Sequence, residues 1–212
     1  MNNETRILTI ITTSFVPYGG LATVVLNYYR YLDRDKFHMD FASSNAIDIV
    51  LRNELIANGS TYYRLSHRGN ILRHMYELQK IAKDYDVVHI HSNSATAVLE
   101  LMPTKLAGVS KRVLHIHNTT CNHKVIHKML HPLMAKLSTN NLAYSKLAGE
   151  WIFKEYTILN KAIDLNKYEF DANKRDIVRR EYGIEKGTFV IGHVGKFAKQ
   201  KNHRFLIELF KK

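Results

Sequence analysis

Val190-Ile-Gly-His-Val-Gly-Lys-Phe-Ala-Lys-Gln-Lys-Asn-His203, near the end of the chain, combines a strand pattern, a tight turn and a cluster of positive charges. Val190, Ile191 and Val194 predict the apolar part of a buried strand, and Gly195 allows a tight turn where that strand ends. Lysines fill the next loop, and an apolar-periodic helix begins at His203. Because helix N-terminal amides and lysines both attract anions, the pattern predicts a phosphate or diphosphate site. The alternative is a basic surface loop between two ordinary elements, and spacing alone favours neither.

Strand and helix patterns alternate through the first 160 residues, which is typical of a parallel sheet covered on both faces. We therefore predict an α/β fold, with a Rossmann-like, mostly parallel sheet of six or seven strands and helices on both faces. Strands are expected at 6–12, 37–42, 61–65, 87–91, 112–117 and 141–145. Helices are expected at 21–32, 50–58, 71–84, 96–107 and 124–137, with a last one that Ser145 caps and that runs to residue 153.

The charge of the chain is strongly and unevenly positive, with a formal net charge of +12. Residues 101–149 contain seven lysines and arginines and no carboxylate, and residues 171–212 contain 11 against five. Such faces suit nucleic acid, lipid headgroups or phosphorylated substrates. We expect no nucleic acid, because no recognisable binding module is present. The single Cys121 excludes an internal disulfide framework, and no signal peptide or membrane span is predicted.

Three sequence elements resemble family 4 glycosyltransferases, which are retaining, nucleotide-sugar-dependent enzymes of the GT-B fold. Gly195-Lys-Phe197 with Gln200-Lys-Asn-His203 resembles the Gly-Arg-Phe and Gln-Lys-Asn element that opens their second domain. Tyr144-Ser-Lys-Leu-Ala-Gly-Glu-Trp-Ile-Phe153 resembles a run found in capsule and exopolysaccharide members. Leu159-Asn-Lys-Ala-Ile-Asp-Leu-Asn-Lys-Tyr168 resembles the Asn-Gly-Ile-Asp signature of the domain junction. With the glycine pair at 19–20, these matches cover nearly the whole chain in the family's order.

The resemblance implies a division of the chain into three parts. Residues 1–163 would form the N-terminal, acceptor-side Rossmann-like domain, residues 164–173 a linker, and residues 174–212 an incomplete start of the donor-binding C-terminal domain. The family's glutamate pair would lie beyond Lys212. We therefore expect that the chain as given does not transfer sugar by itself, and that residues from about Asp171 onward pack loosely.

The resemblance also implies roles for particular residues. The donor, expected to be a UDP-sugar, would be held at its diphosphate by Gly19, Gly20, Lys196 and Lys201. His117 matches the family's active-site histidine, which contacts the donor sugar. Candidates for contact with the acceptor or for support of His117 are His91, Asn118 and Thr119. Without the resemblance, the glycine pair is better interpreted as a plain tight turn.

Two His-x-His pairs end consecutive predicted strands, His89/His91 and His115/His117. Side chains at i and i+2 of a strand point to one face. A zinc site would need further ligands, such as His123 or Cys121. The GT-B resemblance implies that the protein holds no metal and no cofactor, so packing or ordinary hydrogen bonding is the favoured interpretation for His89 and His115.

The predicted helix at 124–137 is cationic and amphipathic. An ordinary helix that packs its apolar side on the core is the favoured interpretation, with His127 and His131 on a solvated polar face. The alternative is attachment to an anionic membrane through Lys124, Lys128 and Lys136. That alternative would place a cytoplasmic protein at the inner face of the cell membrane.

Three functions remain open from the sequence. The first is the N-terminal part of a glycosyltransferase that moves a sugar from a nucleotide-sugar donor to a glycan or lipid-linked acceptor in surface polysaccharide synthesis. The second is a catalytically inactive fragment of such an enzyme. The third is a basic anion-binding module unrelated to sugars.

Overall fold

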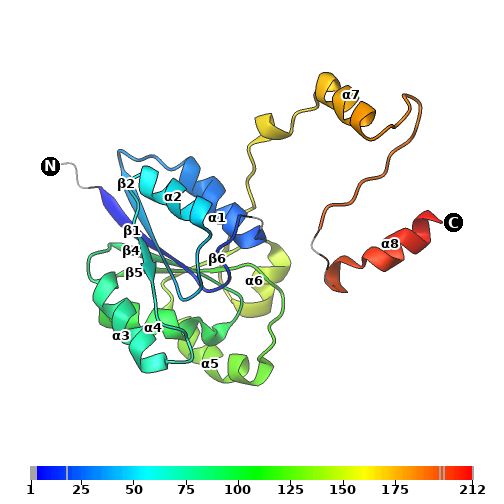
Figure 1. Ribbon diagram of the computed structural model, residues 1–212. Helices are drawn as coiled ribbons and strands as arrows, with labels where there is room; N and C mark the ends of the chain where they lie inside the picture. The colour runs from blue at the N-terminus through cyan, green and yellow to red at the C-terminus, as the bar shows by residue number, and fades with distance from the viewer. Residues whose placement is uncertain (1–3, 18, 196, 198, 212) are drawn as a thin grey trace. The chain divides into compact units, whose positions relative to one another are not determined.

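The computed structural model describes residues 4–17, 19–195, 197 and 199–211. The chain divides into two compact units, Met1–Asp164 and Leu165–Lys212. The first unit contains a sheet and the helices that cover it, and the second contains short helices joined by extended chain (Figure 1).

A seven-stranded sheet forms the centre of the first unit, and every pair of neighbouring strands is parallel. The strand order is β3-β2-β1-β4-β5-β6-β7. The prediction of an α/β fold with six or seven mostly parallel strands is confirmed. The strands are β1 (Thr5–Ile11), β2 (Phe37–Ser43), β3 (Tyr62–Arg64), β4 (Val87–Ser92), β5 (Lys111–Ile116), β6 (Asn140–Ala143) and β7 (Thr157–Ile158).

Helices connect these strands as the apolar periodicity predicts. Ser145 caps the last helix of the unit, since its side chain accepts a hydrogen bond from the backbone N–H of Ala148 at 3.3 Å. A short 3₁₀ turn, η1 (Ala95–Ala97), forms the start of the helix predicted at 96–107. The helices are α1 (Gly20–Arg30), α2 (Ile49–Ala57), α3 (Ile71–Ala82), α4 (Val98–Leu106), α5 (Lys124–Leu137) and α6 (Lys146–Ile152).

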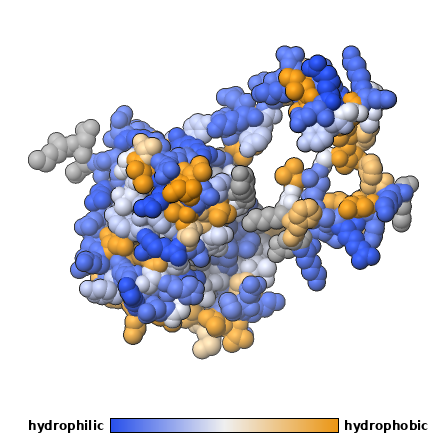
Figure 2. Space-filling model, in the orientation of Figure 1, coloured by the Kyte–Doolittle hydropathy of each residue, from blue (hydrophilic) through white to orange (hydrophobic). Residues whose placement is uncertain are grey.

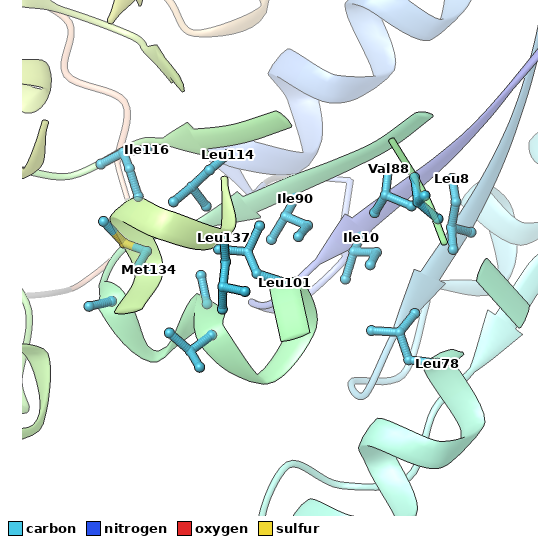
Figure 3. Close-up of a cluster of buried hydrophobic side chains, with 14 of the residues drawn as sticks. Leu8, Ile10, Leu78, Val88, Ile90, Leu101, Leu114, Ile116, Met134 and Leu137 are labelled. Atoms are coloured by element: carbon cyan, nitrogen blue, oxygen red, sulfur yellow. The ribbon is translucent and has the colours of Figure 1, made fainter. Parts of the chain in front are cut away.

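The two faces of the sheet bury separate apolar clusters. Figure 1 shows α1 and α2 on one side of the sheet and α3, α4 and α5 on the other. Alternation along β1 assigns Leu8 and Ile10 to the side of α3, and Ile11 to the side of α1. Figure 3 shows the larger cluster, which includes Val88, Ile90, Leu114 and Ile116 from the sheet and Leu78, Leu101, Met134 and Leu137 from the helices.

The second unit lacks a buried core, because no described residue of Leu165–Lys212 is buried. It contains η2 (Leu165–Tyr168), α7 (Ala172–Glu181), η3 (Lys199–Lys201) and α8 (His203–Phe210). The helix predicted from His203 is confirmed. Helix α7 was not predicted, because it has few apolar residues, although Asp171 caps it by accepting from the Lys174 N–H at 3.0 Å.

The strand predicted over Val190–Val194 is wrong. These residues form no strand, and Val194 is 98% exposed. A parallel strand needs at least one neighbouring strand for its backbone hydrogen bonds and is normally covered by helices on both faces. Since the described part of the second unit contains no strand, the backbone groups of this stretch have no ladder to join.

Gly149 in α6 allows a close approach that a larger residue would disturb. A Cβ at this position would lie 2.1 Å from the ring of Tyr156. We therefore expect Gly149→Ala to lower the free energy of unfolding by about 1–2 kcal/mol, because the ring must move. Urea unfolding measures the effect, and Gly187→Ala is the control, since a Cβ there meets nothing within 4 Å. Equal losses in the two variants would contradict the packing argument.

Candidate functional site

The site lies at the carboxyl ends of the parallel strands. Chain order along the sheet reverses between β1 and β4, which are neighbours although β2 and β3 separate them in sequence. Ligands of open α/β sheets bind outside such a switch point. The loops here are joined to one another: Thr12, after β1, donates its N–H and hydroxyl to the His91 carbonyl at 3.3 and 2.9 Å. His117, after β5, donates its N–H to the Ser92 carbonyl at 3.4 Å.

Gly19 and Gly20 open α1 directly after the β1 loop. Gly19 is the N-cap, with its N–H donated to the Val16 carbonyl at 3.0 Å, and Gly20 is the first helical residue. A Cβ on Gly20 would meet nothing within 4 Å, so the space beside it is open. The first amides of a helix have no intrahelical partner and carry the positive end of its dipole. The glycine pair therefore leaves the helix N-terminus accessible to an anion.

His117 and His91 form a buried pair at the ends of β5 and β4. His91 Nδ1 and His117 Nε2 are 2.8 Å apart, and the residues are 3% and 8% exposed. The Nδ1 of His117 has no hydrogen-bond partner among the described residues. Burial, and then the neighbouring imidazoles, lower the pKa of His117 to about 3, so it is neutral at pH 7. The expectation that His117 lines an open cleft is wrong, because the side chain is largely covered.

His89 and His115 complete a square of four imidazoles on one sheet face. Ring centroids are 4.1 Å apart for His89 and His91, 5.4 Å for His89 and His115, and 4.2 Å for His115 and His117. These residues alternate with the apolar residues of the larger cluster, so they point to the side of α1. Neither ring nitrogen of His115 has a hydrogen-bond partner among the described residues. Burial lowers the pKa of His115 to about 4 and that of His89 to about 3.

Lys161 is a cation beside this site that the sequence did not single out. Its Nζ lies 4.8 Å from the centroid of the Tyr144 ring, which is stacked near His117 at 6.4 Å. The charge of Lys161 is one of the causes that lower the pKa of His117. Position 161 belongs to the junction signature, but there asparagine is usual in the family, so the signature gave no hint of a cation.

The other predicted site residues are placed as follows. Asn118 and Thr119 are exposed in the loop after β5. Lys201, in the second unit, lies against Gly195, where a Cβ would be 3.3 Å from the Lys201 Cγ. Lys196 falls outside the described residues.

Helix α5 differs from its prediction in which side it buries. Met134 and Leu137 face the core, but Val125 is 74% and Met129 75% exposed. The histidines are turned inward: His127 Nδ1 accepts from the Ala95 N–H at 3.1 Å, and the His131 Nε2 is 2.7 Å from the Ile152 carbonyl. The solvated polar face predicted for them is therefore wrong, because backbone groups of η1 and α6 supply hydrogen-bond partners there.

The fold and the strand-end site place the chain among Rossmann-like α/β proteins. Comparison with known sequences makes the class specific: the pattern of Glycosyltransferase Family 4 matches residues 18–158. The chain belongs to this family.

Individual relatives agree with this assignment. EpsF of Bacillus subtilis (strain 168), named as a glycosyltransferase, is 27% identical over 226 residues, covering 98% of this chain and 58% of EpsF. The UDP-Gal:alpha-D-GlcNAc-diphosphoundecaprenol alpha-1,3-galactosyltransferase of Escherichia coli is 29% identical over 150 residues, covering 65% of this chain and 38% of that enzyme. The crystal structure of Acinetobacter baumannii MurG shares the fold, with a TM-score of 0.51 and 11% identity over 76% of this chain and 46% of that one. The chain thus spans well under two thirds of each relative.

Proposed function

We propose that this chain supplies the acceptor-side part of an enzyme that transfers a sugar from a nucleotide-sugar donor to a glycan or lipid-linked acceptor. The observation that carries the proposal is that an accessible helix N-terminus follows β1 and a buried neutral histidine pair ends β4 and β5, so both lie at the carboxyl edge of the sheet. Family membership gives the reaction class, and the strand ends give the place where donor and acceptor would meet.

Each part of the site has a role in this proposal. The amides at the start of α1, after Gly19, and the charge of Lys161 would face the donor diphosphate. Lys196 and Lys201 would add charge from the second unit. The Nδ1 of His117 is buried and has no partner among the described residues, and it would contact a hydroxyl of the donor sugar once the groups that cover it move aside. Asn118 and Thr119, being exposed, would contact the acceptor.

A UDP-sugar donor and a diphosphate-lipid acceptor are the finer parts of the proposal. They are supported by the name of the E. coli relative, which specifies UDP-galactose and a diphosphoundecaprenol acceptor. By the same inference, the transfer would retain the anomeric configuration of the donor sugar and would serve surface polysaccharide synthesis.

The test uses a version extended to the full length of the relatives, because the matched region covers only 58% of EpsF and 38% of the E. coli enzyme. Transfer of labelled sugar from UDP-galactose, UDP-glucose and UDP-N-acetylglucosamine to a polyprenyl-diphosphate-linked sugar is measured. Transfer from at least one donor is expected. If no donor is bound or turned over, the chain is an inactive relative. If the protein binds no donor but binds RNA with an affinity that falls steeply as the salt concentration rises, the result would instead support the basic anion-binding module.

We also propose that α5 docks the protein on an anionic membrane. No helix among the described residues is long and apolar enough to cross a bilayer. Helix α5 instead presents exposed Val125 and Met129 between Lys124, Lys128 and Lys136. Figure 2 shows apolar surface at the lower edge of the first unit, where Figure 1 places α5. Exposed apolar residues flanked by lysines suit the boundary between headgroups and acyl chains.

Co-sedimentation with vesicles tests this docking. Replacing Lys124, Lys128 and Lys136 by glutamine should lower partition onto vesicles that contain phosphatidylglycerol about 100-fold, since each lysine contributes about 1 kcal/mol. The charge-matched control replaces the exposed Lys80, Lys83 and Lys111 by glutamine and should bind as the parent does. Equal binding to neutral vesicles, or equal loss in both variants, would contradict the proposal.

A further inference from the structure

We propose that His89, His91 and His115 form a binding site for a zinc ion. One ring nitrogen from each of the three lies within 4.8 Å of the other two. The histidines come from two adjacent strands, β4 and β5, in which His91 and His115 are direct neighbours. A His-x-His pair on one strand and a histidine on the next thus converge from rigid elements on one face of the sheet.

The hydrogen bonding of the cluster is the second observation. His115 is 1% exposed, yet neither of its ring nitrogens has a hydrogen-bond partner among the described residues. The Nε2 of His89 is also buried and also has no hydrogen-bond partner among them. A buried polar group without a partner costs about 1–3 kcal/mol. Apolar residues are the usual occupants of buried parallel strands, and they would avoid this cost. A single ion held by three nitrogens would give a partner to the His89 Nε2 and to one ring nitrogen of His115, while His91 keeps its hydrogen bond with His117.

The ligand set selects the kind of metal. The cluster offers three imidazoles, and none of the three pairs with a carboxylate in the described structure. Mg²⁺ and Ca²⁺ prefer oxygen ligands, whereas zinc accepts three histidines and leaves a fourth position for water or another ligand. Zinc–nitrogen bonds of about 2.0–2.1 Å place tetrahedral ligands about 3.4 Å apart, so the rings must close by about 1 Å. Rotation about side-chain bonds suffices for a movement of this size.

The His91–His117 hydrogen bond supports the site and links it to the proposed sugar contact. Because His91 Nδ1 is engaged with His117, the Nε2 of His91 is its metal ligand. Metal on Nε2 requires the proton of His91 on Nδ1, from where it is donated to His117 Nε2. His117 then carries its own proton on Nδ1, the atom that we propose faces a sugar hydroxyl. Zinc would thereby fix the tautomer of His117 without itself contacting the donor.

The experiment titrates the 212-residue chain, without a polyhistidine tag, with Zn²⁺ at pH 7.5. Calorimetry with a competing chelator should give one ion per chain. The double variant His89→Gln/His115→Gln should bind at least about 100-fold more weakly, since two of three ligands are lost. The matched control is His127→Gln. It removes one histidine of the His127/His131 pair on α5, outside the proposed site, and should bind zinc as the parent does.

A second measurement does not depend on the variants folding. Long-range ¹H–¹⁵N spectra of the parent chain report the state of each histidine ring. On addition of Zn²⁺, three rings should show metal-bound nitrogens and His117 should become the Nδ1–H tautomer. Binding that survives the double variant, rings that do not respond to zinc, or the absence of stoichiometric binding would each overturn the proposal. Donor binding is not part of this test, so its outcome is independent of the proposed transferase activity.

Discussion

At pH 5, with a chelator present, the first unit is expected to be less stable than at pH 7 by about 6 kcal/mol or more. The cause is the square of imidazoles formed by His89, His91, His115 and His117. Burial, as the largest cause, lowers the pKa of all four, to about 3 for His89 and His117 and to about 4 for His115. The unfolded chain has no such burial, and there each histidine binds a proton with a pKa of about 6.5.

The sign follows from which state binds more protons. Above pH 6.5 both states hold neutral imidazoles, so the stability that depends on these groups is fully present. As the pH falls below 6.5, the unfolded state gains protons that the folded state excludes, so stability is lost. His89, His115 and His117 each contribute a loss of about 2 kcal/mol at pH 5, and His91, whose pKa burial also lowers, adds to the loss in the same direction. A domain with a total stability of about 5–15 kcal/mol would be close to its acid transition at that pH.

His74 acts in the opposite direction and does not cancel the effect. Burial lowers its pKa, but hydrogen bonds with Glu100 at 3.2 Å and with the Ser66 carbonyl at 2.9 Å outweigh burial, so the net shift is upward. Its contribution is fully present below pH 6.5 and is lost only as the pH rises through its raised pKa. The pKa of His127 is also lowered, mainly by burial, so His74 opposes five histidines and the net dependence stays on the acid side.

Urea unfolding at pH 5, 6, 7 and 8, followed by circular dichroism, measures the dependence. The slope of the unfolding free energy against pH gives the number of protons taken up; near pH 5, about three are expected from His89, His115 and His117, and His91 adds to them. His115→Gln should reduce that number by one, because it removes one imidazole whose pKa is lowered in the folded state. An unfolding free energy that is flat between pH 7 and pH 5 would show that these imidazoles accept protons in the folded state.

Much of the first unit could be predicted from its sequence, because its local patterns agree with its tertiary packing. The run Val87–Ser92 is apolar where it faces α3 and α4, and the bounds of α5, Lys124–Leu137, match its apolar periodicity. The second unit could not be predicted in the same way. Val190–Val194 has the composition of a buried strand, but a strand depends on neighbours, and the described second unit contains none.

The site was predicted only in part, for a physical reason. The position of a residue at the end of a strand is encoded in the sequence next to it. Gly19, His91 and His117 could therefore be placed at the carboxyl edge of the sheet from the sequence. The contacts among side chains are not local. The pairing of His91 with His117, the partnerless nitrogens of His115 and the approach of Lys161 to Tyr144 depend on register between β4, β5 and β6 and on the return of the chain after β7.

Replacing His117 by alanine in a version extended to the length of the relatives is expected to lower kcat for sugar transfer about 100- to 1,000-fold. The proposed contact joins the His117 Nδ1–H to a hydroxyl of the donor sugar, and it becomes stronger as charge develops on that sugar. The imidazole is neutral at pH 7 and is held in place by His91 at 2.8 Å, so it needs little reorganisation during the reaction.

The variant should fold, because the ring that it removes belongs to the polar histidine cluster and not to either apolar core cluster. Its unfolding free energy at pH 7.5 should therefore fall far less than its activity. His117→Asn places an amide nitrogen near the position of Nδ1 and should recover part of kcat, which a purely structural role would not explain. His123→Gln, at an exposed position outside the cluster, is the matched control and should retain full activity. If His117→Ala transfers sugar as fast as the parent, or loses activity only in proportion to its loss of folded protein, His117 does not contact the donor sugar.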